Sequence, residues 1–302
     1  MNTLVMFPAL DLGSWFPRQD PQVAPVAFGT VLLAAIVKVI AVFTIWMAGV
    51  AFLTLAERTG LYLDLTGLGC YHKADVPAWY DALDEPARWA AQANFWAAIA
   101  KQCQDSPAVF CYDLMNEPVV AGAKRAPGDW LGGAFAGKHF VQFITLDAAG
   151  RAPPAVASEW IRTLTKAIRQ HDQKHLVTVG LVDWSLDRPG LRSGFVPDKI
   201  AADLDFICVH LYPKRGEVPK AIETLRGFAV GKPVVIEETF PLQTGVPEFS
   251  QFIAQSSHLS QVLRKLFSEI LDVIHCWRII RHVHGLSLRV VSDIELSTTY
   301  LL

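Results

Sequence analysis

Residues 108–118 read AVFCYDLMNEP, an apolar run that ends in Asn116, Glu117 and a proline. A run of this kind is typical of a strand covered on both faces, and the proline marks its end. Residues 82–104 before it and residues 157–172 after it place apolar side chains at helical spacing. The alternation of helix and strand around this run predicts an α/β protein with a parallel sheet.

Four further runs have strand character, and a short helical pattern separates the last two. The strands are expected at residues 60–66, 175–182, 204–213 and 232–238, and the helix at about residues 217–227. The repeated order leaves two closures open, a barrel and a doubly wound sheet. A (β/α)8 barrel of ordinary size would occupy most of the 302 residues.

The composition excludes several classes of protein. Hydrophobic residues make up 52% of the chain and charged residues 19%, which indicates a large core rather than disorder. A formal net charge of -2, without runs of like charge, argues against a nucleic-acid partner. The five cysteines are scattered and form no CxxC pair, so they indicate neither a disulfide framework nor a metal site.

The segment over residues 26–56 is apolar apart from Lys38, and residues 39–56 carry no charge. That length is close to what a helix needs to cross a bilayer. The segment begins too far from Met1, and lacks the basic flank, to be a signal peptide. Two interpretations remain open: a membrane anchor, and an early strand and helix buried in the barrel.

These patterns divide the chain into three parts. Residues 1–56 are a leader with the apolar segment, residues 57–255 are the barrel core, and residues 256–302 are a divergent C-terminal segment that begins with a long amphipathic helix. The chain is expected outside the cell or in the cell envelope, with residues 26–56 as the candidate membrane anchor.

Polar side chains stand at the ends of three predicted strands. Glu117 ends the first, His210 and Tyr212 end the second, and Glu237 and Glu238 end the third. The carboxyl ends of parallel strands carry the active sites of α/β enzymes. A half-buried carboxylate is costly unless it is paired or used. Two carboxylates that face each other at this edge predict glycoside hydrolysis, in which one donates a proton and the other attacks.

Three motifs in this order, LMNEP (114–118), VHLYP (209–213) and KPVVIEE (232–238), resemble the cellulase-type enzymes of glycoside hydrolase family 5. The resemblance covers about residues 55–255. It implies a (β/α)8 TIM-type barrel, atypical at both ends of this chain. It also implies a retaining enzyme that cleaves β-linked glycans such as glucan or mannan, with no cofactor and no metal.

The resemblance gives each matching side chain a role. Glu117 is the catalytic acid/base, Glu238 is the nucleophile, and Asn116 contacts the sugar 2-hydroxyl. His210 and Tyr212 line the site and orient the nucleophile. The alternative for His210 is a core histidine that only bonds a backbone carbonyl.

Other residues are assigned from their positions in the sequence. Strand alternation separates Glu238 from Glu237, whose side chain is expected to point the other way, so Glu237→Gln should be far milder than Glu238→Gln. Trp184 is expected to stack on a sugar face, with a core or rim position as the alternative. Trp130 is expected to line the substrate cleft. Asp113 is expected to be a buried carboxylate paired with an arginine.

Three features differ from the family pattern. Members carry an arginine near the end of the second strand, and the segment just before residue 57 offers none. They end the eighth strand with a sugar-stacking tryptophan, for which Trp277 is the candidate, and Thr66 stands where relatives often have a histidine. These differences keep an alternative function open: a non-catalytic or truncated, membrane-anchored barrel that binds glycan without hydrolysing it.

Overall fold

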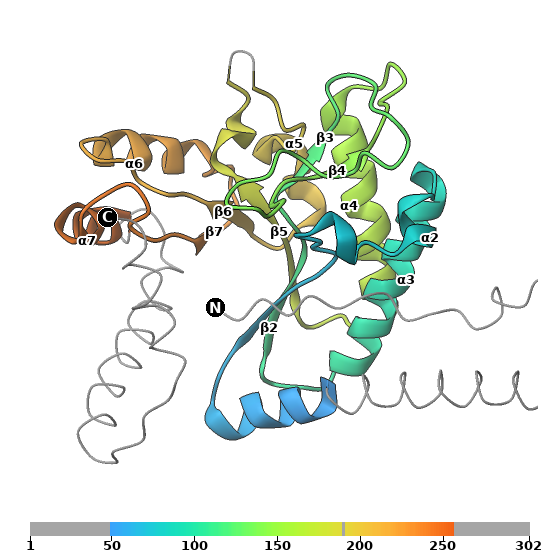
Figure 1. Cartoon of the computed structure of the whole chain (residues 1–302). Coiled ribbons are helices and arrows are strands. Elements are labelled where there is room, and N and C mark those ends of the chain that lie inside the picture. The colour runs from blue at the N-terminus through green and yellow to red at the C-terminus, as the bar shows by residue number, and fades with distance from the viewer. Residues whose placement is uncertain (1–48, 189–190, 257–302) are drawn as a thin grey trace, which may run out of the picture.

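A computed structural model describes residues 49–188 and 191–256 of the chain. Five parallel strands form one sheet in the order β1-β2-β5-β6-β7 (Figure 1). Each of these strands lies within one of the five runs that predicted it, so the α/β class and the parallel sheet are confirmed. The strands are β1 (Leu63–Thr66), β2 (Val109–Asn116), β5 (Leu176–Val182), β6 (Ile207–His210) and β7 (Val234–Glu238).

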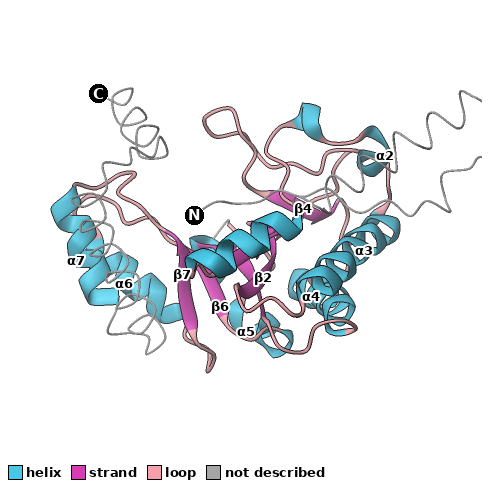
Figure 2. Cartoon of the chain, turned by 90° about the horizontal axis from the view of Figure 1, so that it is seen from below, coloured by secondary structure: helices cyan, strands magenta, loops and turns pink. Residues whose placement is uncertain are grey.

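The longer helices form two pairs beside the sheet (Figure 2). α3 (Glu85–Cys103) packs along α4 (Pro153–Arg169), and α6 (Val218–Gly227) packs with α7 (Val246–Ser256) near β7. The carboxylate of Asp84 caps α3 by accepting a hydrogen bond from the N–H of Ala87 over 3.0 Å. The three helices predicted between the strands are confirmed as α3, α4 and α6.

Shorter elements complete the described chain. β3 follows β2 after the single residue Glu117, so that a second, two-stranded sheet fixes the chain beyond this glutamate. This small sheet was not among the predicted elements. The shorter elements are a helix over residues 49–59, α2 (Ala78–Asp81), α5 (Pro197–Ile200), η2 (Lys73–Asp75), η3 (Asp183–Leu186), η4 (Ala201–Asp203), β3 (Pro118–Val120) and β4 (Gln142–Thr145).

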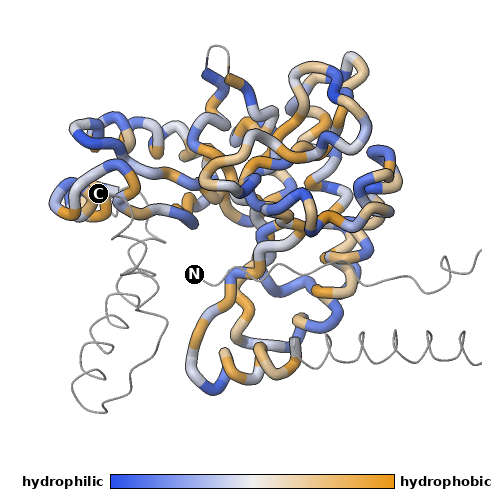
Figure 3. Tube along the Cα trace, viewed as in Figure 1, coloured by the Kyte–Doolittle hydropathy of each residue, from blue (hydrophilic) through white to orange (hydrophobic). Residues whose placement is uncertain are grey.

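The two faces of the five-stranded sheet differ in chemistry because side chains alternate along each strand. One face packs against the helices in the main core, to which Leu114, Val209 and Ile236 belong. The other face carries a small apolar cluster and, toward the carboxyl ends of the strands, a group of carboxylates. Figure 3 shows hydrophobic residues concentrated along the central strands. The small cluster consists of Cys111, Phe206, Cys208 and Val235.

The described end of the apolar segment is the helix over residues 49–59, in which Ala56 is buried against Leu63 and Ala108. Residues 49–188 and 191–256 contain no helix that is both long and apolar enough to cross a membrane. The rest of the apolar segment, residues 26–48, lies outside the described residues. So do Trp277 and the helix predicted after residue 256.

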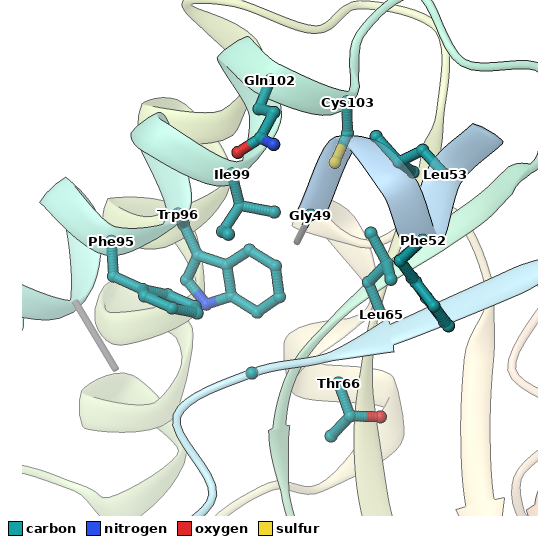
Figure 4. Close-up of a pocket in the computed structure, with 11 residues that line it drawn as sticks. Gly49, Phe52, Leu53, Leu65, Thr66, Phe95, Trp96, Ile99, Gln102 and Cys103 are labelled. Carbon is teal, nitrogen blue, oxygen red and sulfur yellow. The ribbon is translucent and has the colours of Figure 1, made fainter. Parts of the chain in front are cut away.

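An apolar pocket lies between the helix over residues 49–59, β1 and α3 (Figure 4). Phe52, Leu65, Trp96 and Ile99 are among the residues that line it, and the lining contains no carboxylate. Its volume of about 30 Å³ is too small for a sugar ring. The pocket is therefore separate from the carboxylate group at the strand ends.

Candidate active site

The imidazole of His210 lies at the centre of the carboxylate group. His210 is the last residue of β6 and is only 3% exposed. Its Nδ1 lies 3.2 Å from Oε1 of Glu117 and 3.5 Å from Oε2 of Glu238, and its Nε2 lies 3.1 Å from Oε2 of Glu237. Both ring nitrogens therefore face carboxylates, which excludes the alternative of a histidine bonded only to a backbone carbonyl.

An irregularity at the end of β2 positions Glu117. In the pairing of β2 with β5, Asp113 lies opposite Thr178 and Asn116 opposite Gly180, so β2 has one residue more than its partner. A bulge of this kind redirects the side chains that follow it. Glu117 then adopts a φ of 46°, in the left-handed region, while its N–H donates to the carbonyl of Gly180 over 3.0 Å. Such a conformation is strained for a non-glycine residue and is found most often at functional sites.

A second irregularity, in β7, positions both Glu237 and Glu238. Val209 lies opposite Ile236, but the next residue of β6, His210, lies opposite Glu238. Glu237 is thus the extra residue, and the register shift lets two consecutive glutamates approach the same imidazole from different sides. Both side chains end at His210, Glu237 at Nε2 and Glu238 at Nδ1.

Glu117 and Glu238 are the two accessible members of the group. One oxygen of each and one nitrogen of His210 lie within 4.8 Å of one another. Their side chains are 15% and 35% exposed, whereas that of Glu237 is only 4% exposed. The same donor types could bind a metal ion, but here both imidazole nitrogens are shared with carboxylates, an arrangement suited to holding protons.

Hydrogen bonds and charge set the protonation of the groups around the pair. Burial opposes a charge on His210, but hydrogen bonds to Glu117 and Glu237 outweigh it and raise its pKa well above the ordinary value. Tyr212 donates from its hydroxyl to Oε2 of Glu238 over 2.5 Å. Burial, and then this bond, raise the pKa of Tyr212, so that the phenol remains a donor.

Asp113, which is buried, and Asp64, which is half-buried, form an acidic layer beneath the site. Asp113 is fully buried, and its Oδ1 accepts from the N–H of Gly180 over 2.7 Å. Burial, and then the charge of Asp64, raise the pKa of Asp113 to about 7. The predicted partner was wrong: among the described residues no arginine pairs with Asp113, and the N–H of Gly180 is its hydrogen-bond donor. A raised pKa allows a buried carboxyl group to stay neutral and removes the need for a cation.

The remaining predicted residues have different surroundings. Asn116 is 2% exposed and donates from Nδ2 to the carbonyl of Phe140 over 3.1 Å, next to Glu117. Trp184 lies half-buried in η3, directly after β5, and its contact with a sugar stays a prediction. The assignment of Trp130 to the cleft was wrong, because it is 2% exposed and its Nε1 donates to the carbonyl of Asp81.

Sequence reasoning missed three residues at the site. Burial, and then the charges of Glu238 and other nearby carboxylates, raise the pKa of Tyr71 to about 12. Phe240 is 49% exposed and lies edge-on to Tyr212 with ring centroids 5.3 Å apart. Gly180 carries no motif, yet a Cβ there would come within 2.7 Å of Nε2 of His210. An aromatic residue after a strand was the available signal for the first two; the glycine gave none.

Comparisons with known proteins point to carbohydrate-active enzymes. The chain is 25% identical over 213 residues to mannan endo-1,4-beta-mannosidase A of Aspergillus aculeatus, covering 61% of this chain and 48% of that protein. It is 24% identical over 176 residues to a probable mannan endo-1,4-beta-mannosidase A of Aspergillus flavus, covering 52% and 38%. The chain thus spans about half or less of the length of these relatives.

A solved β-glucuronidase from Ruminococcus gnavus, in complex with uronic deoxynojirimycin, matches with a TM-score of 0.32 and 17% identity over 51% of this chain and 22% of that chain. The model of the family Cellulase (glycosyl hydrolase family 5) matches residues 71–238, which is more than half of the 302 residues. That stretch contains β2, β5, β6 and β7, together with both accessible glutamates. This chain belongs to the cellulase family, glycosyl hydrolase family 5.

Proposed function

We propose that this chain is a retaining glycoside hydrolase that cleaves β-linked polysaccharide by double displacement, with β-mannan as the first candidate substrate. Membership of glycosyl hydrolase family 5 supports the reaction class. The two mannan endo-1,4-beta-mannosidase relatives favour mannan over glucan. The identity to both is low, so β-glucan remains the second candidate substrate.

The observation that carries the proposal is the separation of Glu117 and Glu238. Their facing oxygens lie within 4.8 Å of each other. Retaining glycosidases hold their two carboxyl groups about 5–5.5 Å apart, whereas inverting enzymes need about 6.5–9.5 Å to admit a water molecule. The short separation therefore favours direct attack by a carboxylate.

In the first step, Glu238 attacks the anomeric carbon while the bond to the leaving oxygen breaks, and Glu117 gives its proton to that oxygen. In the second step, Glu117 removes a proton from water, and the resulting hydroxide displaces Glu238 from the anomeric carbon. The configuration is inverted twice and so retained, and Glu117 ends the cycle protonated again.

Neighbouring groups orient the two glutamates. The hydroxyl of Tyr212 and Nδ1 of His210 contact Oε2 of Glu238 at 2.5 Å and 3.5 Å, which holds one oxygen and leaves the other for attack. Asn116 uses one amide hydrogen for the carbonyl of Phe140, so its second hydrogen is free to bind the sugar 2-hydroxyl.

The first experiment is reducing-sugar release by the full chain on β-mannan, β-glucan, xylan and soluble cellulose. We expect the wild type to release sugar from one substrate class. The rate of release should fall at least about 1,000-fold in Glu238→Gln, because the covalent step needs the carboxylate. Glu223→Gln, on the exposed face of α6, is the matched control and should hydrolyse normally.

A second experiment assigns the roles. With an activated aryl β-glycoside and azide, Glu238→Ala should form the α-glycosyl azide, since azide then occupies the place of the nucleophile. Glu117→Ala should form the β-glycosyl azide, since azide then attacks the covalent intermediate. The opposite pairing of product and variant would exchange the two roles, and hydrolysis with inversion in the wild type would overturn double displacement.

The alternative is a barrel that binds glycan without hydrolysing it. Binding of β-mannan by folded wild-type protein, without release of sugar from any substrate, would establish this alternative. The absence of a suitable arginine just before residue 57 is the sequence feature that favours it. The expected location, outside the cell or in the cell envelope, stays a prediction in either case.

A further inference from the structure

Glu237 makes more contacts than an incidental neighbour of Glu238 would need. Its side chain is 4% exposed, and its Oε2 lies 2.9 Å from Sγ of Cys208 and 3.1 Å from Nε2 of His210. A carboxylate only accepts hydrogen bonds, whereas a thiol and an imidazole N–H donate them. Glu237 thus joins two residues of β6 that lie on the same face of the strand.

Asp64 is the other acidic group beside Glu237. Burial, followed by the charge of Glu237, raises the pKa of Asp64 well above its ordinary value. Two adjacent carboxylates cannot both be ionised at low cost, so one keeps a proton. Asp64, whose pKa is raised, is therefore the carboxyl group of this pair that keeps a proton.

Gly180 leaves room for this contact. A Cβ at this position would lie 2.7 Å from Nε2 of His210 and 3.2 Å from Oε2 of Glu237. The imidazole and the carboxylate therefore meet directly against the backbone of β5. The contact between Glu237 and His210 also depends on the register shift in β7, because this shift turns Glu237 and Glu238 toward different nitrogens of one ring.

We propose that Glu237 is a positioning residue that holds His210 by its Nε2–H, and so fixes which imidazole nitrogen faces the two accessible glutamates and in which protonation state. Because the Nε2–H is hydrogen-bonded to Glu237, only Nδ1 can exchange a proton with Glu117 and Glu238. The part of this inference that concerns turnover rests on the proposed function; the part that concerns His210 does not.

The charge around His210 makes the effect large enough to measure. The imidazole is surrounded by acidic groups from three strands, and β5 contributes only Gly180 on its side. Without the negative charge of Glu237, the imidazolium loses its nearest fully buried counter-charge. The titratable groups around His210 are Asp64 of β1, Asp113 of β2, Glu117 directly after β2, and Glu237 and Glu238 of β7. Cys208 of β6 faces Glu237.

The wild-type protein gives the first test, by nitrogen NMR of its nine histidines, assigned through the backbone. The inference expects that His210 keeps the hydrogen on Nε2 across the accessible pH range and that only Nδ1 titrates. A neutral His210 with hydrogen on Nδ1 and none on Nε2 would overturn it. This measurement requires neither substrate nor a folded variant, so it is independent of whether the chain hydrolyses glycans.

Variants give the second test. In Glu237→Gln the midpoint of the Nδ1 titration should fall by about 1–2 pH units, the size expected from removing an adjacent charge. Glu237→Asp, which keeps the charge, should recover most of the fall, and the exposed control Glu223→Gln should show none. If Glu237 served packing alone, Glu237→Gln would lose unfolding free energy but keep the midpoint of the His210 titration. That result would overturn the inference.

Turnover links the positioning role to the reaction. The pH profile of kcat/KM for Glu237→Gln should move to lower pH together with the His210 midpoint, while KM changes little. A shifted midpoint in a protein that hydrolyses no glycan would uphold the positioning role and reject the proposed function instead.

Discussion

The hydroxyl of Tyr212 lies 2.5 Å from Oε2 of Glu238, although the two residues are 26 positions apart in the chain. Tyr212 is the second residue after β6 and Glu238 ends β7, so the parallel pairing of these strands brings them together. A phenol that donates to a carboxylate stabilises the ionised form and restricts its rotation. Tyr212 therefore orients the carboxylate of Glu238, which attacks the sugar in the proposed reaction.

Tyr212→Phe removes this hydrogen bond without changing the ring. A hydrogen bond to a charged group contributes about 1.5–3 kcal/mol, so kcat/KM should fall roughly 10- to 100-fold. The measurement is initial-rate hydrolysis of the substrate found in the glycan panel. Tyr62→Phe is the matched control, because Tyr62 is 70% exposed, and equal losses in both variants would contradict the assigned role.

Gly180→Ala should displace His210. The added methyl group would meet Nε2 and Cε1 of the imidazole at 2.7 Å and 2.9 Å, inside contact distance. Overpacking of this kind costs about 1–3 kcal/mol of unfolding free energy, and kcat/KM should fall as well. Gly133→Ala is the control, since a Cβ at Gly133 meets nothing within 4 Å. Denaturant unfolding with parallel kinetics tests this; full activity in Gly180→Ala would refute it.

Asp113→Asn should stabilise the protein at high pH. The pKa of Asp113 is raised to about 7, first by burial and then by the charge of Asp64, so ionisation destabilises the folded state. The wild type should lose stability as the pH rises from about 4, the unfolded-state value, through 7. The variant should match the wild type near pH 4 and exceed it at pH 8 by on the order of 3 kcal/mol. The free energy of unfolding is measured in urea across this pH range. A difference between variant and wild type that stays constant with pH would contradict the prediction.

Asp172→Asn should have the opposite pH dependence. Burial alone would raise the pKa of Asp172, but hydrogen bonds from His175 and Tyr112, at 2.5 Å and 2.7 Å, lower it to about 2. This group stabilises the fold above about pH 4, and its contribution disappears as the pH falls toward 2. The variant should lose roughly 2 kcal/mol at pH 7, with the difference closing in acid.

The control for this change is Asp105→Asn. Asp105 is 85% exposed, in a 3.4 Å ion pair with Lys174, and such pairs contribute little. Thermal or urea unfolding at pH 7 and at pH 3 separates the two positions. A loss in Asp172→Asn that stays constant with pH would show that packing, and not charge, accounts for it.

The sequence was sufficient to predict the sheet because each described strand of it is a short apolar run between helical patterns. Residues 108–118 predicted β2 and residues 232–238 predicted β7, with the glutamates at their ends. The apolar segment was ambiguous, because hydropathy does not distinguish a buried helix from a spanning one. Only its end, in the helix over residues 49–59, lies within the described residues.

Trp130 and Asp113 show where local reasoning failed. A tryptophan in a glycine-rich stretch suits a cleft wall, yet the ring of Trp130 packs over the guanidinium of Arg88 in the interior. A buried aspartate suggests a cation, yet Asp113 accepts a hydrogen bond from the N–H of Gly180. Both partners come from other parts of the chain, and residue type alone does not specify them.

The sequence by itself determined the order of the strands, their chemistry and the family, because apolar periodicity and ordered motifs are local properties. Only the tertiary structure decided how Glu117, Glu237 and Glu238 share His210. Strand alternation assigns consecutive residues to opposite faces, but an extra residue in β2 and another in β7 redirect the side chains that follow. A bulge depends on the register between two strands, and register is set by packing across the sheet rather than by either strand alone.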